Sequence, residues 1–104
     1  NKKVIWVLQA PEVGPKLEVQ MRKALDNFGN ASSVSRDWWS KRMAKVRAFA
    51  EEHTQTIQIY DPVDIFCEEI ECFSVKDGVT LYRDRDHMSL SAARKIVTRI
   101  NQQL

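Results

Sequence analysis

Two short apolar segments, separated by stretches of helical periodicity, most constrain the fold of this chain. Lys3–Leu8 is an apolar run with β-branched residues, and Thr56–Tyr60 is a second one. Such runs are typical of strands that are buried on both faces of a parallel sheet. Because parallel strands are joined by a crossover that usually contains helix, the residues between the two runs suit that role. The pattern therefore predicts an α/β protein.

Three stretches repeat apolar residues at steps of three and four, which predicts helices. Gly29 is placed to end the first stretch, and Ser35 and Ser89 can cap the second and third. A polar turn is expected at Asn30–Ser35, between the first two helices. The predicted helical stretches are 16–28, 36–53 and 90–104.

The segment between the second strand and the last helix has shorter signals. Asp61–Pro62 ends the strand, and Asp64–Cys67 is expected to form a helical turn. Cys72–Val75 and Val79–Tyr82 resemble strands, and the Lys76–Gly78 turn between them predicts a hairpin.

The predicted strands are too few for a complete domain of this class. Only the two apolar runs are strong enough to be central strands, and two such strands do not make a sheet that is buried on both faces. The 104 residues suffice for one small domain but not two, and the chain begins with Asn1. We therefore expect residues 1–104 to be the back half of a larger doubly wound domain, with any targeting segment upstream.

Composition excludes several classes of function. The formal net charge is +2, and basic and acidic residues alternate without a block of one sign, so no nucleic-acid partner is expected. The longest apolar run, Val4–Leu8, is far shorter than the roughly 20 residues of a membrane-spanning helix. That run is also too short for a signal peptide.

The two cysteines stand in Cys67-Glu-Glu-Ile-Glu-Cys72. Four intervening residues can close a small disulfide loop, whereas two thiols cannot complete a four-ligand zinc site. The glutamates between them disfavour a reactive thiolate. The spacing favours a disulfide, with a reduced and inert pair as the alternative. An oxidised pair implies an extracytoplasmic compartment.

The most reactive stretch is the charged loop between the hairpin and the last helix. Asp84 precedes His87 by three residues, a spacing that lets a carboxylate orient an imidazole as a general base. Asp86 adjoins His87 and is expected to point elsewhere, while Met88 and Leu90 are expected to pack inward and hold the loop. Two alternatives remain: the carboxylates pair with nearby arginines (Arg83, Arg85 or Arg94), or Asp84, Asp86 and His87 bind a metal. No further ligands are spaced to complete a metal site, and no cofactor is expected.

Tyr82–Ser89 resembles the last sequence block of the SGNH hydrolase/acyltransferase superfamily, where a tyrosine and Asp-x-x-His precede Leu-Ser. It looks most like SGNH domains fused to bacterial membrane O-acyltransferases, which modify lipopolysaccharide O-antigen and related glycans. Other segments are similar to the same subgroup more loosely: Val4–Leu8 with Pro11, Asp61–Pro62, the cysteine pair and Lys76–Gly78. Met88 replaces the usual Leu, a volume-conserving change, and Ala92 stands where the subgroup often has Gly.

The resemblance implies a flavodoxin-like, three-layer SGNH fold in which Asp84 orients His87 and His87 activates a serine. The Gly-Asp-Ser nucleophile block and the Gly and Asn oxyanion blocks have no counterpart in this sequence. The implied partners are therefore the upstream half of the SGNH domain, a membrane acyltransferase domain and a glycan acceptor. The implied location is the periplasm or extracytoplasmic face of the inner membrane. The chain is not expected to be active alone.

Two alternative functions remain open, an esterase and a non-catalytic binding module. An esterase of the same superfamily would also use Asp84 and His87. A non-catalytic glycan-binding or interaction remnant would use Trp38 and Trp39, although aromatic residues at this spacing more often form a buried helix face. His53 is expected to interact with the carbonyl groups at the end of the second helix.

Overall fold

The computed structural model describes residues 3–13, 16–84 and 87–103 and has two small sheets with five helices in these ranges. β1 and β3 pair in parallel, while β2, β4 and β5 form an antiparallel sheet in that order. The predicted α/β class is thus confirmed, with parallel and antiparallel sheets both present. The strands are β1 (Ile5–Val7), β2 (Ala31–Ser35), β3 (Gln58–Tyr60), β4 (Glu71–Lys76) and β5 (Val79–Thr80), and the helices are α1 (Leu17–Leu25), α2 (Arg36–Arg42), α3 (Ala44–Glu51), α4 (Val63–Phe66) and α5 (Leu90–Gln103).

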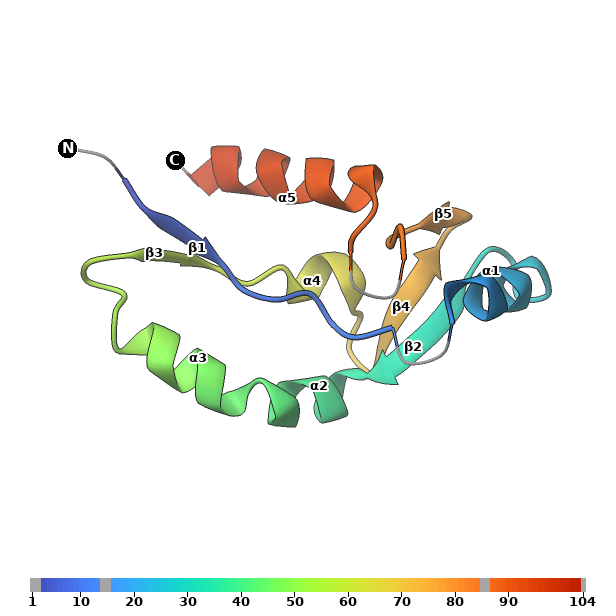
Figure 1. The fold of residues 1–104 in the computed structure, drawn as a ribbon, viewed down its shortest axis with the longest axis horizontal. Coiled ribbons are helices and arrows are strands. Elements are labelled where there is room, and N and C mark those ends of the chain that lie inside the picture. Colours follow the sequence, from blue (N-terminus) through green and yellow to red (C-terminus); the bar gives the residue numbers. More distant parts are fainter. Residues whose placement is uncertain (1–2, 14–15, 85–86, 104) are drawn as a thin grey trace.

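The two sheets lie toward opposite ends of an elongated molecule measuring 48 × 26 × 22 Å. In Figure 1 the β1–β3 pair lies between α5 and the α2–α3 segment, while α1 lies beside the antiparallel sheet. One core cluster joins residues of α2, α4 and α5, with Trp39, Phe66 and Leu81 at most 1% exposed. Helices thus lie on both sides of the parallel pair in this view, without burying both of its faces.

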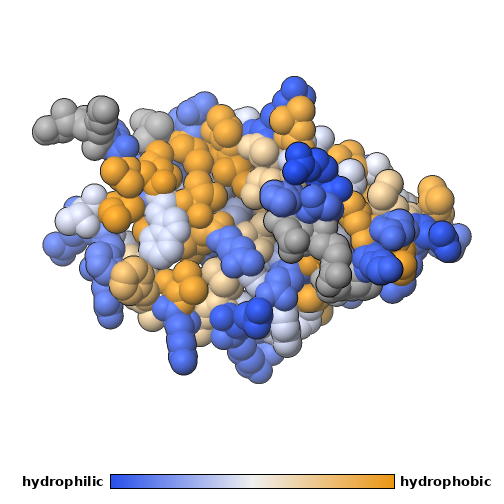
Figure 2. Space-filling model, viewed as in Figure 1, coloured by the Kyte–Doolittle hydropathy of each residue, from blue (hydrophilic) through white to orange (hydrophobic). Residues whose placement is uncertain are grey.

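The parallel pair is less buried than the sequence predicts. Trp6 pairs with Ile59, and the Leu8 amide donates to the Tyr60 carbonyl at 2.9 Å. Yet Val4 is 58% exposed and Val7 38%, because two strands cannot cover each other's faces and edges. Figure 2 shows apolar side chains gathered on the surface at this end of the molecule. The prediction that both strands are buried on both faces is wrong for the chain as described.

The predicted polar turn at Asn30–Ser35 is instead strand β2. It pairs with β4, with Ala31 opposite Val75 and Ser32 opposite Phe73, and its register shifts between pairs. Serine-rich residues without regular alternation give no strand signal by themselves. The pairing with β4 supplies the backbone hydrogen bonds that decide the conformation.

The helices begin and end near, but not at, the predicted positions. Ser35 caps α2 as predicted, because its Oγ accepts from the Trp38 amide at 3.1 Å. The single helix expected over 36–53 is divided at Met43 into α2 and α3. The first helix ends at Leu25, and Phe28 lies beyond it with 96% of its surface exposed.

Two tight turns meet at the far end of the antiparallel sheet. Asp77 and Gly78 have φ angles of 51° and 80°, as the predicted β4–β5 hairpin requires. Gly29, at φ 84°, accepts a hydrogen bond from the Gly78 amide at 2.9 Å. A Cβ on Gly29 would lie 2.6 Å from the Gly78 nitrogen, so only glycine permits this contact.

A disulfide joins Cys67 and Cys72, as predicted, and both cysteines are buried. The two residues face each other across an antiparallel bridge, and the Glu68 amide donates to the Glu71 carbonyl at 2.8 Å. Arg36 holds this loop to α2. Its guanidinium donates to Asp64 at 2.9 Å and to the Glu68 carbonyl at 3.2 Å. The loop thus has support besides the covalent bond.

Tyr82 joins three segments in the core. Its ring centroid lies 5.3 Å from that of Phe66, and its hydroxyl donates to the Pro11 carbonyl oxygen. Tyr82 and Met88 also form an isolated antiparallel bridge. Burial raises the pKa of the Tyr82 phenol far above its ordinary value, because phenolate would lose its hydration there.

We expect the disulfide to contribute about 2 kcal/mol to the free energy of unfolding, since a loop this short loses little chain entropy when it closes. The Cys67→Ser/Cys72→Ser variant should lose no more than that and remain folded. Urea denaturation of both proteins measures the difference. Alkylation without reductant should label no thiol. The protein is unfolded before alkylation, because burial in the native state would also protect reduced cysteines. Two labelled thiols in material from an oxidising compartment would contradict the disulfide.

We expect Tyr82→Phe to cost about 1 kcal/mol of unfolding free energy at pH 7, because the Pro11 carbonyl loses its donor. In the parent protein, the folded-state pKa of Tyr82 is raised. The contribution of Tyr82 to the free energy of unfolding is therefore fully present below the ordinary tyrosine pKa of about 10. That contribution is lost at higher pH, as Tyr82 ionises in the unfolded chain.

The variant should lose less stability than the parent between pH 7 and pH 11, as measured by urea denaturation at both pH values. Tyr60 is shifted in the same direction and is unchanged in the variant, so part of the alkaline decline should remain. Identical declines in the two proteins would show that Tyr82 ionisation does not govern alkaline stability.

Candidate active site

The loop that carries Asp84 and His87 is closed by hydrogen bonds at its base. The Ser89 amide donates to the Leu81 carbonyl at 2.9 Å, and the Ser89 hydroxyl donates to the Thr80 carbonyl at 2.8 Å. Ser89 Oγ also accepts from the Ala92 amide at 3.2 Å, which fulfils its predicted capping role for α5. Nearer the tip, the Arg83 amide donates to the His87 carbonyl at 2.8 Å. These contacts limit how far His87 can move.

Asp84 and His87 are in direct contact. His87 Nδ1 lies 2.9 Å from Asp84 Oδ1 and 3.1 Å from Oδ2, and the His87 amide donates to Oδ1 at 2.8 Å. A carboxylate at Nδ1 favours the tautomer with its proton on that nitrogen, which leaves the Nε2 lone pair available. The Asp-x-x-His spacing makes this contact within a single turn. The carboxylate thus holds the imidazole at Nδ1, which is one of the contacts that a general base of this kind uses.

The site lies at the surface and carries other charges. The side chains of Asp84 and His87 are 50% and 63% exposed, and Arg83 Nε is 3.9 Å from Asp84 Oδ2. The ion pairing considered from the sequence thus exists alongside the imidazole contact. Asp86 and Arg85 lie outside the described residues. Within the described ranges, no group of three or more His, Cys, Asp and Glu side chains is arranged to hold a metal.

The residues that flank the loop are packed unequally. Met88 is half-buried and packs against the core, as expected. Leu90 was also expected to point inward, but it is 67% exposed. Leu90 begins α5, whose buried residues are Ala92 and Ile96, so its position in the first turn falls outside the covered face. One apolar anchor therefore holds the loop instead of two.

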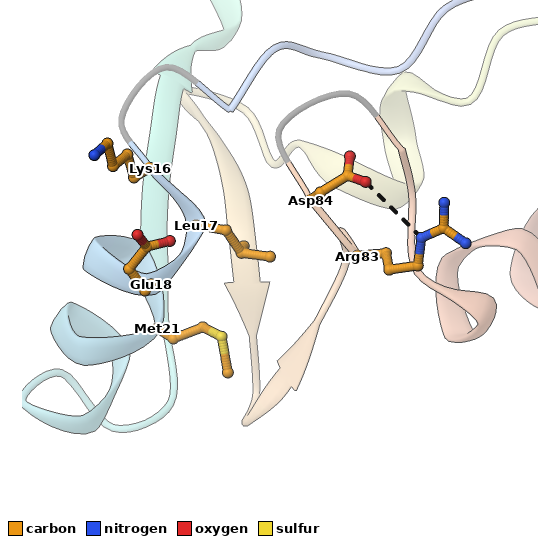
Figure 3. Close-up of a pocket in the computed structure, with 6 residues that line it drawn as sticks. All are labelled: Lys16, Leu17, Glu18, Met21, Arg83 and Asp84. Atoms are coloured by element: carbon orange, nitrogen blue, oxygen red, sulfur yellow. Dashed lines mark ion pairs between the residues drawn. The ribbon is translucent and has the colours of Figure 1, made fainter.

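A cavity of about 330 Å³ adjoins Asp84. It lies between the first turns of α1 and the loop, and Figure 3 shows Leu17 and Met21 directed from α1 toward the hairpin side. The helical spacing of Leu17 and Met21 predicts only that they lie on the same face of α1. Nothing in the sequence indicates that α1 lies next to Asp84, because that proximity depends on the packing of α1 against β2 and β4.

The aromatic residues considered for ligand binding are mostly used in packing. Trp39 is 1% exposed, so it is not available to stack on a sugar, while Trp38 is 44% exposed and lies under the Arg42 guanidinium at 5.5 Å. His53 Nδ1 lies 2.9 Å from the Phe49 carbonyl oxygen, which confirms its predicted contact with carbonyl groups at the end of α3.

Comparison with known proteins identifies the family of the chain but not the roles of its residues. Residues 1–102 match the family described as SGNH domain, fused to AT3 domains. No curated protein and no solved structure matches the chain significantly. In the part of the chain that the structure describes, no helix is long and apolar enough to cross a membrane. The AT3 fusion partner is a membrane acyltransferase, which gives the family an acyltransferase-related function. This chain belongs to the SGNH domains of that fused type.

Proposed function

We propose that this chain contributes the Asp–His pair of a Ser-His-Asp triad in an O-acyltransferase. The enzyme transfers an acyl group, typically acetyl, to a sugar hydroxyl of lipopolysaccharide O-antigen or a related surface glycan. The observation that carries the proposal is the contact of His87 Nδ1 with both oxygens of Asp84, at 2.9 and 3.1 Å. Membership of a family fused to AT3 domains supports acyl transfer over other triad chemistry.

The contact suits a two-step transfer. In the first step, His87 Nε2 takes the proton from a serine as its Oγ bonds to the acyl carbon, and the proton then passes to the departing donor group. In the second step, Nε2 takes the proton of the sugar hydroxyl as that oxygen bonds to the acyl carbon. The serine–acyl bond then breaks, and serine regains the proton. Asp84 stabilises the imidazolium formed in each step.

The serine is proposed to come from the preceding part of the same domain. Two of the described serines have structural roles. The Ser89 hydroxyl donates to the Thr80 carbonyl and accepts from the Ala92 amide, and the buried Ser74 hydroxyl donates to Gln20 and to the Ala31 carbonyl. The Gly-Asp-Ser block that would mark a nucleophile is not in this sequence. The Cys67–Cys72 disulfide supports an extracytoplasmic location for the assembled domain.

The surface around β1 supports a junction with further strands. Val4 and Val7 are exposed there, and Phe49 is 55% exposed beside Trp6, with ring centroids 6.1 Å apart. Parallel sheets are almost always covered on both faces. The preceding half of the domain would supply both additional strands and this cover.

Asp84→Asn should lower kcat by about 10⁴ in the longest natural polypeptide that contains this chain, because the amide would favour the wrong imidazole tautomer. Asp86→Asn is the matched control and should change kcat little. The assay follows acyl transfer from a chromogenic ester to a sugar acceptor. Circular dichroism should show both variants folded.

The outcome separates a catalytic site from a surface cluster. Equal, mild effects of the two substitutions would contradict the proposal, since ordinary ion pairing predicts that result. A large effect of Asp86→Asn alone would show that Asp86, and not Asp84, orients His87. Release of free acid without sugar product would indicate an esterase that uses the same pair.

Val4→Lys should weaken association with the preceding half of the domain at least tenfold when the halves are expressed separately and mixed. The charged side chain would need to lose its hydration in the junction. Val79→Lys, on β5 at the other end of the molecule, is the control and should leave association unchanged. Both positions are exposed, 58% and 41%, so neither change should unfold the chain. Equal association of the parent and Val4→Lys chains would place the junction elsewhere.

A further inference from the structure

The end of α1 and the turn after it carry the two most exposed large apolar side chains among the described residues. Phe28 is 96% exposed and Leu25 is 86% exposed. We call these two residues the α1 tip. In Figure 1 the tip lies at the end of the molecule opposite β1. The junction proposed at β1 therefore lies far from it, and a different contact is needed to cover these side chains.

The backbone holds Phe28 in an unfavourable conformation. Its φ angle is 54°, in the left-handed region, where a bulky side chain is rare and strained. Glycine and asparagine adopt this region at lower cost. Folding alone therefore favours a residue other than phenylalanine at this position, and the exposed ring is better explained by a contact outside the chain.

Hydrogen bonds hold the tip in place and keep it from folding back onto the core. The Gly29 amide donates to the Ala24 carbonyl at 2.8 Å, and Asn30 Nδ2 donates to the Phe28 carbonyl at 3.3 Å. The Asp77 amide donates to Asn30 Oδ1 at 3.0 Å, which joins this turn to the β4–β5 hairpin. Because the backbone is already ordered, a contact at the tip loses little conformational entropy.

The charges beside the tip do not oppose contact with phospholipid headgroups. Arg22 and Lys23 stand in the last turn of α1, and among the described residues neither forms an ion pair. Both are therefore available to headgroup phosphates. The acidic residues of the two joined turns are Asp26 and Asp77, so the two signs are balanced.

We propose that the α1 tip inserts into the headgroup region of a phospholipid bilayer. Exposed Phe and Leu side chains beside basic residues are typical of surfaces that lie in a membrane interface. A protein partner would need a pocket that matches one protruding ring, whereas lipid adapts to its shape. Fusion of this family to a membrane acyltransferase keeps a bilayer within reach, so a weak contact suffices to orient the domain. The inference rests on the family and not on the Asp84–His87 reaction.

Lipids that carry a nitroxide near the headgroup locate the contact residue by residue. The chain, labelled with ¹³C at leucine and isoleucine methyl groups, is mixed with bicelles of phosphatidylethanolamine and phosphatidylglycerol that contain such a lipid. The Leu25 signals should broaden about fivefold more than those of Ile70 and Leu90. These two controls are 77% and 67% exposed. Ile70 stands between Glu69 and Glu71, which anionic headgroups repel.

Two variants test the ring of Phe28. Phe28→Asn should reduce the broadening of Leu25 about fivefold, because the ring no longer leaves water for the interface. Its urea midpoint should not fall, since asparagine tolerates the left-handed conformation better. Leu90→Asn removes an exposed apolar side chain of α5 and should leave the Leu25 signals unchanged.

The proposal is overturned if Leu25 broadens no more than Ile70 and Leu90, or if both variants reduce its broadening equally. A Leu25 signal that shifts with the detergent-solubilised membrane acyltransferase domain, yet does not broaden in bicelles, would assign the tip to a protein contact instead. A lower urea midpoint for Phe28→Asn would show that the ring serves the fold. The Asp84→Asn kinetics do not enter these outcomes, so failure of the membrane contact and failure of the proposed reaction are distinguishable.

Discussion

The buried Tyr82 is the contact on which the position of the candidate site depends. Its ring packs on Phe66 of α4, its hydroxyl binds the Pro11 carbonyl after β1, and its backbone bridges to Met88. One residue thus connects the parallel pair, the helix before the disulfide and the loop that carries His87. Because these segments are far apart in the sequence, the contacts of Tyr82 fix the position of the His87 loop relative to the rest of the fold.

Some parts of the candidate site depend on local interactions and others on long-range packing. The Asp84–His87 contact spans three residues and closes within its own loop. The cavity beside Asp84 depends on α1, which begins more than sixty residues earlier and lies next to the loop through its packing against β2 and β4. The proposed chemistry therefore resides in a short motif, whereas the cavity beside it depends on the tertiary arrangement.

Several features were predictable because they need only neighbouring residues. Ser35 and Ser89 cap helices through bonds to amides three residues on. Asp77 and Gly78 form a hairpin turn whose positive φ angles their residue types tolerate. Cys67 and Cys72 were close enough to pair, and Asp84 was one turn from His87. In each case the interacting residues are close together in the sequence, so the contact can form with little help from the rest of the fold.

The sequence by itself determined the α/β class, the caps, the hairpin, the disulfide and the acid–imidazole contact, because each is set by residue type and spacing. Only the tertiary structure decided that Ala31–Ser35 is a strand, since its hydrogen bonds come from β4, forty residues away. The exposure of Val4 and Leu90 and the cavity beside Asp84 were decided in the same way. Periodicity shows which residues share a face, but burial depends on what packs against that face.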